Sequence, residues 1–289
     1  MIAKKNGSMI EIEFDGVDDL MKTANRYKEP KFESDARMIS ECFTRENDWN
    51  GHSTLKKVGE ALLEPTPKMN AVIATGESLF DSEDWATEKP RRKIKRRLED
   101  GDEIDVERWI DREPDMWEES KKVKGPRFGV RIGVNVAAAG SVGLDGFRWR
   151  TSAVVAILNI CEELNIPCEV MCYHRADEFT HSDCNVRTKF PVKRPEHLLD
   201  IDLLAYVLGD RSFFRCAVLG SEVISVAEVG ERADSGLGYP REWNKPEPNE
   251  FILSRSCLSE SVARDEVARF KNWLVAIRER SRYNLDEQG

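Results

Sequence analysis

The stretch that decides the fold runs from Arg127 to His174 and reads RFGVRIGVNVAAAGSVGLDGFRWRTSAVVAILNICEELNIPCEVMCYH. Its first part, Phe128–Val136, alternates and then becomes wholly apolar, which is typical of a strand buried on both faces. After a loop of small residues, Phe147–Leu164 has a centre that is apolar nearly all round, which predicts a helix covered from more than one side. Cys168–Tyr173 then predicts a second strand. Two parallel strands joined by a helix form a right-handed crossover unit, so this stretch predicts an open α/β sheet.

The rest of the chain supplies further elements to such a sheet. Expected strands are Met9–Phe14, at an edge of the sheet, and Phe251–Leu253. Expected helices are Val17–Tyr27, a helix capped by Ser53 and ending near Leu63, Met69–Phe80, Pro195–Leu208 and a last helix after Ser259, with a helix and a strand within Arg211–Ile224. The polar segments Arg175–Lys193 and Ser235–Asn249 predict loops. We therefore expect an α/β fold with a Rossmann-like, mostly parallel sheet flanked by helices.

Changes in composition suggest a division of the chain. Residues 88–107 are dominated by charge and predict a connector, and the pair Gly125-Pro126 marks a boundary. Residues 1–125 are then expected to form a smaller, α-rich N-terminal region, and residues 126–289 the main α/β domain.

The overall composition restricts the class of protein. The chain has 44 Lys and Arg against 53 Asp and Glu, a net charge of −9, which argues against a nucleic-acid binder with a wholly basic surface. No apolar run approaches the roughly 20 residues that cross a bilayer, and the N-terminal residues lack the apolar core of a signal peptide. The seven scattered cysteines indicate reduced thiols rather than a disulfide framework. We expect a cytoplasmic protein that does not contact membranes.

The order strand, small-residue loop, buried helix, strand, helix, strand, helix resembles a von Willebrand factor A (vWA) domain. In that family the first strand ends in D-x-S-x-S and a later strand ends in Asp, and these side chains hold a divalent ion. The matching positions here are Asn135, Ala137 and Ala139, and Ser254 follows the later strand. Because hard cations need several oxygen ligands, preferably charged, the resemblance implies a vWA-like domain with no metal site and no cofactor.

The wider layout resembles a set of uncharacterised phage- and plasmid-encoded proteins. These join a W-x-G-x-S helix start, an acidic D-V segment with a following Pro, and a vWA-like domain without a metal site. The matching residues are Trp49, Gly51, Ser53, Asp105, Val106 and Pro114. The resemblance implies a protein encoded by a phage or a mobile element, and it brings no activity with it.

A cluster of basic residues allows two interpretations. Six cations fall within seven positions, at Arg91, Arg92, Lys93, Lys95, Arg96 and Arg97. An acidic run follows at once, so one interpretation is a solvated connector whose charges cancel. The other is an arm that contacts phosphates, which would make the protein a nucleic-acid-binding accessory factor.

A second cluster has the residue types of a zinc site. Cys172, His174, His181 and Cys184 place two thiols and two imidazoles within thirteen residues. The alternative is a buried Cys172 with polar histidines in a loop.

The sequence also contains weak signals for catalysis. The acidic residues Asp102, Glu103, Asp105, Glu107 and Asp111 include paired carboxylates of the kind that metal-dependent nucleases use, although such a run is commonly a solvated face. Ala138–Gly143 follows a strand but lacks the spacing of a phosphate-binding loop.

We therefore predict a non-enzymatic, macromolecule-binding module with a protein partner. Because ligands collect at the carboxyl ends of the strands in open α/β sheets, the expected contact surface is formed by the loops Ala137–Asp145 and Arg175–Arg187. Its candidate residues are Asn135, Ser141, Asp145, Arg148, Arg175 and Asp177. The alternatives are a nucleic-acid-binding accessory factor that uses the basic run, and a hydrolase or nuclease with an unrecognised site. The sequence does not set the oligomeric state.

Overall fold

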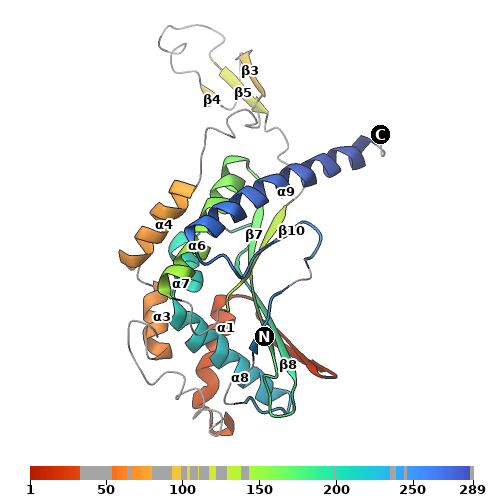
Figure 1. Ribbon diagram of the computed structural model, residues 1–289. Helices are drawn as coiled ribbons and strands as arrows, with labels where there is room; N and C mark the ends of the chain where they lie inside the picture. Colours follow the sequence, from red (N-terminus) through yellow and green to blue (C-terminus); the bar gives the residue numbers. More distant parts are fainter. Residues whose placement is uncertain are drawn as a thin grey trace.

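The computed structural model describes residues 1–32, 54–63, 67–79, 93–98, 103–104, 110, 117–121, 129–137, 143–197, 200–234, 239–243 and 246–286 (Figure 1). The strands of its large sheet are β1 (Ile2–Asn6), β2 (Met9–Glu13), β6 (Val130–Asn135), β7 (Cys168–Asp177), β8 (Asn185–Lys193), β9 (Tyr239–Pro240) and β10 (Glu250–Leu253). The helices are α1 (Val17–Asn25), α3 (Leu55–Leu63), α4 (Pro67–Leu79), α6 (Leu144–Glu163), α7 (Ile201–Gly209), the π-helical η4 (Phe213–Val218), α8 (Leu219–Glu228) and α9 (Glu260–Asp286), with short 3₁₀ turns η1 (Arg26–Lys28) and η2 (Pro30–Phe32). Of the helices in these ranges, none combines the length and the apolar character needed to cross a membrane.

The large sheet has the strand order β1-β2-β8-β7-β6-β10, and β9 pairs with β7. Parallel pairing joins β2 to β8 and joins β7, β6 and β10, whereas β1–β2, β7–β8 and the short β7–β9 pair are antiparallel. The predicted α/β class, an open and mostly parallel sheet flanked by helices, is confirmed. The decisive stretch folds as expected, with β6 and β7 parallel and α6 between them.

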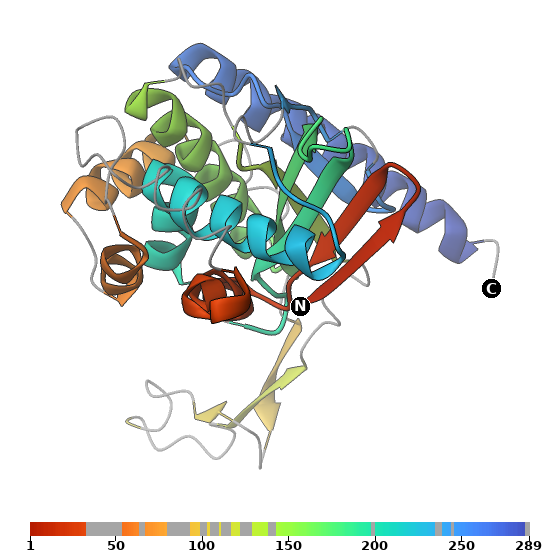
Figure 2. The same cartoon turned by 90° about the horizontal axis from the view of Figure 1, so that it is seen from below.

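The helices gather on one side of this sheet (Figure 2). Strand β8 shows the difference between the two faces, because Val186, Thr188 and Phe190 are buried whereas the alternate Arg187 and Lys189 are partly exposed. Helix α6 lies centrally among the helices and contacts α4, α7 and α9. The side chains from Ala153 to Leu158 are all fully buried as a result, so the prediction of a helix covered from more than one side is confirmed.

Three sequence-based expectations are wrong. Residues 175–193 were expected to be a loop, but β7 extends to Asp177 and β8 begins at Asn185. Strand β8 was missed because charged residues on its exposed face alternate with the buried ones and make the segment look polar. The strand expected within Arg211–Ile224 is helical instead, since η4 continues into α8 as far as Glu228. Strand β2 is not at the edge of the sheet, because β1 pairs outside it.

The two regions expected on either side of residue 125 share one sheet. Strand β2, from the N-terminal region, pairs in parallel with β8. Side chains of both regions, such as Ile10, Leu20 and Phe270, belong to one hydrophobic cluster. The sequence boundary therefore does not separate two cores.

Gly76 allows α4 to approach α6 closely, since a Cβ atom at this position would lie 2.7 Å from the Cβ of Val155. We expect Gly76→Ala to lower the free energy of unfolding by about 1–3 kcal/mol, because the added methyl overpacks the contact between the two helices. Gly59→Ala in α3 is the matched control, since the nearest atom to its Cβ would be 3.7 Å away and alanine favours a helix. Urea unfolding followed by circular dichroism compares them. A Gly76→Ala midpoint at or above that of the wild type contradicts the close approach.

Candidate functional site: a groove along strand β10

The segment Tyr239–Trp243 lies across the carboxyl ends of β6 and β7, where the contact surface was predicted. Asn135 Nδ2 donates to the carbonyl of Arg241 at 2.9 Å, and the Arg241 N–H donates to the carbonyl of Arg175 at 2.8 Å. The Arg241 guanidinium pairs with Asp177 at 2.8 Å. The structure therefore brings Asn135, Arg175 and Asp177 together, and they hold a segment of the protein's own chain.

Asp145 and Arg148 lie near the start of α6 and pair with each other at 3.0 Å. Their side chains are 82% and 38% exposed, and such an exposed ion pair contributes little to stability. They are available to a partner, but these contacts do not position them with the other predicted site residues.

Arg150 is a charged residue at this edge that the sequence did not single out. Its guanidinium is buried and donates to the carbonyls of Asn135 at 2.6 Å, Ala137 at 3.1 Å and Val136 at 3.3 Å. Burial lowers the pKa of Arg150 to about 10, so it stays protonated at neutral pH. The Oδ1 atom of Asn135 accepts the Ala137 N–H at 3.0 Å. The oxygens at the end of β6 are thus engaged by the protein itself.

The four residues considered as zinc ligands do not form a cluster. The Nδ1 atom of His174 lies 2.7 Å from the Oε1 atom of Glu222, Cys172 and Cys184 are buried, and His181 is exposed. Within the described ranges, no group of three or more His, Cys, Asp or Glu side chains is placed to hold a metal ion. The zinc interpretation is therefore corrected: His174 has a carboxylate partner from α8, which is remote in sequence.

The pair of His174 and Glu222 has the residue types of a catalytic dyad. Their side chains are 2% and 0% exposed, and Phe214 packs edge-on against the imidazole at 5.1 Å between ring centroids. The Oε2 atom of Glu222 and the buried hydroxyl of Thr188 have no hydrogen-bond partner among the described residues. Because neither ionisable side chain is open to a substrate, we assign the pair a structural role.

The basic run falls partly in a small sheet with the order β3-β5-β4, formed by β3 (Lys93–Leu98), β5 (Trp117–Lys121) and β4 (Glu103–Ile104). The strand β3 contains Lys93, Lys95, Arg96 and Arg97. Its register places Lys95 opposite Glu119 and Arg96 opposite Glu118. The same register places Lys93 opposite Lys121, so both opposite and like charges occupy facing positions of β3 and β5.

Other residues named from the sequence lie outside the described residues. These are Arg91, Arg92, Ala139, Ser141, Asp102, Asp105, Val106, Glu107, Asp111, Pro114, Trp49, Gly51, Ser53, Gly125 and Pro126.

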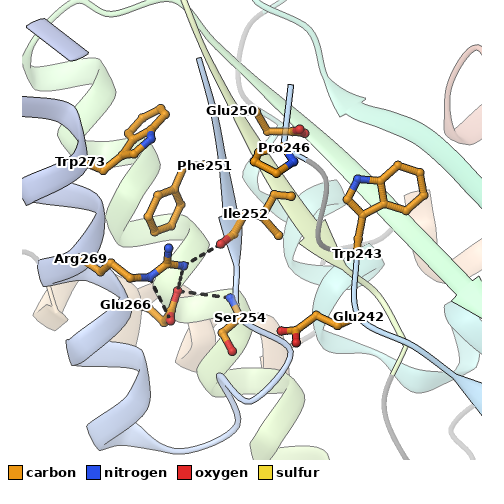
Figure 3. Close-up of a pocket in the computed structure, with 10 residues that line it drawn as sticks. All are labelled: Glu242, Trp243, Pro246, Glu250, Phe251, Ile252, Ser254, Glu266, Arg269 and Trp273. Carbon is orange, nitrogen blue, oxygen red and sulfur yellow. Dashed lines mark hydrogen bonds and ion pairs between the residues drawn. The ribbon is translucent and has the colours of Figure 1, made fainter. Parts of the chain in front are cut away.

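A groove with a volume of about 440 Å³ runs along β10 (Figure 3). Strand β10 is the last strand of the sheet, so its outer edge has no strand partner in the described part of the chain. Helix α9 forms one wall of the groove, and the segment that contains Glu242 and Trp243 forms the other. The groove therefore has a strand edge as its floor.

Two side chains of α9 bind the outward backbone groups of β10. The carbonyl of Asn249 accepts the N–H of Arg131 in β6, so the strand alternation turns the N–H and C=O of Ile252 outward. Arg269 Nη2 donates to the Ile252 carbonyl at 2.6 Å, and the Ser254 N–H donates to Glu266 at 3.3 Å. These side chains occupy the positions where a neighbouring strand would bind.

The wall opposite α9 is fixed by buried contacts. The ring of Trp243 stacks on Tyr173 with centroids 4.4 Å apart and an interplanar angle of 12°. The Tyr173 hydroxyl donates to Glu250, and burial raises the pKa of Tyr173, so it remains a donor at neutral pH. Gly133 makes room for this ring, because a Cβ atom there would lie 2.8 Å from Tyr173 Cε2. These contacts fix the position of the Trp243 wall.

Aromatic contacts also fix the α9 wall. The Phe251 ring packs against Phe270 at 5.2 Å and against Trp273 at 5.5 Å between centroids. The lining includes three carboxylates, from Glu242, Glu250 and Glu266, and one guanidinium, from Arg269. The groove is therefore aromatic and acidic.

Sequence reasoning missed this groove. Trp243 falls in a segment expected to be an exposed loop, and Trp273 lies beside the apolar stripe of the last helix. Trp243, eight positions before the expected strand Phe251–Leu253, was the available signal. No pattern in the sequence around Glu266 and Arg269 indicated that their side chains reach the edge of β10.

No curated protein and no solved structure matches the chain. A family model described as Domain of unknown function (DUF7192) matches residues 4–277, which include all residues that line the groove and the whole large sheet except the first two residues of β1. The chain therefore belongs to the DUF7192 family.

Proposed function

We propose that the protein is a non-enzymatic protein-binding module that takes an extended segment of its partner onto the outer edge of β10. The observation that carries the proposal is the pair of bonds from Arg269 and Glu266 to the outward groups of Ile252 and Ser254. Arg269 reaches the Ile252 carbonyl through a long side chain that is 49% exposed, and a backbone N–H of a partner can replace it.

The physical basis is the exposed edge of a sheet. An unpaired edge strand presents a row of N–H and C=O groups that can pair with another chain, and many domains bind extended peptides in this way. The groove volume of about 440 Å³ lies within the usual range of ligand pockets, which is about 300–1,000 Å³. The rings of Trp243 and Trp273 flank the edge and supply apolar surface for a partner's side chains.

This proposal keeps the macromolecule-binding role expected from the sequence, together with the vWA-like domain without a metal site. It moves the binding surface from the carboxyl ends of β6 and β7, where the segment Tyr239–Trp243 is bound, to the edge of β10. Because pairing with β10 requires no metal ion, we expect peptide binding to be unchanged by EDTA or by added magnesium.

Selection of peptides from a random library on the immobilised full-length protein tests the proposal. We expect selected peptides to bind the wild type and Ile252→Val, and to lose at least tenfold in affinity for Ile252→Pro, as measured by fluorescence anisotropy. Proline removes an N–H that points away from β6, and edge strands tolerate such a substitution. The valine variant keeps that N–H and a similar side chain.

Arg269→Ala provides a second test if Ile252→Pro does not fold. It frees the carbonyl of Ile252, so peptides that pair with β10 should bind this variant more tightly than the wild type. Failure to select any peptide would overturn the proposal. So would peptides whose affinity is the same for all folded variants.

A further inference from the structure

The environment of Arg269 shows which side chain the groove is able to hold. Its guanidinium carbon lies 4.0 Å from the centroid of the Phe251 ring. Its Nη2 atom lies 2.5 Å from the Glu266 carboxylate and 2.6 Å from the Ile252 carbonyl oxygen. An aromatic face, a carboxylate and a backbone carbonyl together satisfy a planar cation with several donors.

Building on the proposed function, we infer that the partner segment carries an arginine or lysine whose cation takes the place of Arg269 between Phe251 and Glu266. Arg269 is then a resident ligand that the incoming side chain displaces. Its side chain is 49% exposed, so it can leave toward solvent without opening the core. Glu266 is 9% exposed and remains in place as the counter-charge.

The charge of the groove supports the same partner. When Arg269 leaves, the carboxylates of Glu242, Glu250 and Glu266 remain without a cation from the lining. Complementary charge favours a basic segment, and like charge disfavours an acidic or phosphorylated one. Glu242 is exposed at the mouth of the groove, where it can attract a second basic residue.

The peptides selected on the full-length protein test this inference. We expect Lys and Arg to be enriched among them relative to Asp and Glu. For a resynthesised peptide, replacing its basic residue by Gln should weaken binding at least tenfold in low salt. The difference should shrink as salt is added, because the contact lies partly in solvent. Exchanging Arg for Lys should cost less than exchanging it for Gln.

Two variants of α9 locate the contact. Glu266→Gln removes the charge but keeps an oxygen that can accept the Ser254 N–H, and it should reduce the preference for the basic peptide over its Gln form. Glu260→Gln is the matched control, because Glu260 is an exposed residue of the same helix that pairs with Arg264 and is not part of the groove lining. This control should leave the preference unchanged.

The outcomes separate the inference from the proposed function. Selected peptides that depend on the edge of β10 but show no basic enrichment, or bind equally after the exchange to Gln, overturn the inference and leave the function standing. An equal loss of preference in Glu266→Gln and Glu260→Gln also overturns the inference. If no peptide is selected, the proposed function fails and the inference fails with it.

Discussion

Replacing His174 by alanine is expected to lower the free energy of unfolding by about 3–5 kcal/mol, because the buried Glu222 loses its partner and the removed imidazole leaves a cavity. The Glu222 carboxylate would be left without its partner at 0% exposure, and its Oε2 atom already has no hydrogen-bond partner among the described residues. Urea unfolding followed by circular dichroism gives the change in free energy.

A double variant distinguishes the pair itself from the packing around it. Replacing both groups by apolar side chains, as in His174→Phe with Glu222→Met, should recover much of the loss, because no buried polar group then remains without a partner. A His174→Ala variant with the midpoint of the wild type would show that the pair contributes nothing to the folded state.

The second large effect is expected at Phe270, where substitution by alanine should lower the free energy of unfolding by about 3–5 kcal/mol. Phe270 is 0% exposed and packs against Phe251 of β10 and Trp273 of α9. Removing the ring leaves a cavity directly behind the floor of the groove. Denaturant midpoints for Phe270→Ala and the wild type measure the cost.

Val275→Ala is the control for this prediction, because Val275 lies on the same helix and is 46% exposed. Exposed substitutions of this kind usually change stability by less than about 0.5 kcal/mol. Equal midpoints for the two variants would contradict the docking of α9 on β10.

The central unit of the fold could be predicted because its residues carry a strong periodic signal. Strands β6 and β7 and helix α6 are apolar where the sheet and the other helices cover them. Strand β8 was missed, since one of its faces is uncovered and carries Arg187 and Lys189. The region from Arg211 to Glu228 is helical throughout although its second half is as apolar as a strand, and burial on several sides explains this composition.

The groove could not be predicted because its residues meet only through tertiary structure. Trp243 is placed by stacking on Tyr173, 70 positions earlier in the chain, and Arg269 reaches Ile252 across a turn and a helix. The contacts of Arg150 could not be predicted for the same reason. Its hydrogen-bond acceptors are backbone carbonyls at the end of β6, and nothing in the sequence around Arg150 identifies them.

Amide hydrogen exchange of the full-length protein, with and without a selected peptide, tests the central claim most directly. Pairing with the outer edge of β10 should slow exchange at Ile252, whose N–H points away from the sheet, and leave β1, the strand at the opposite edge, unchanged. Unchanged exchange along Glu250–Ser254 at saturating peptide would contradict the claim that β10 is the binding edge.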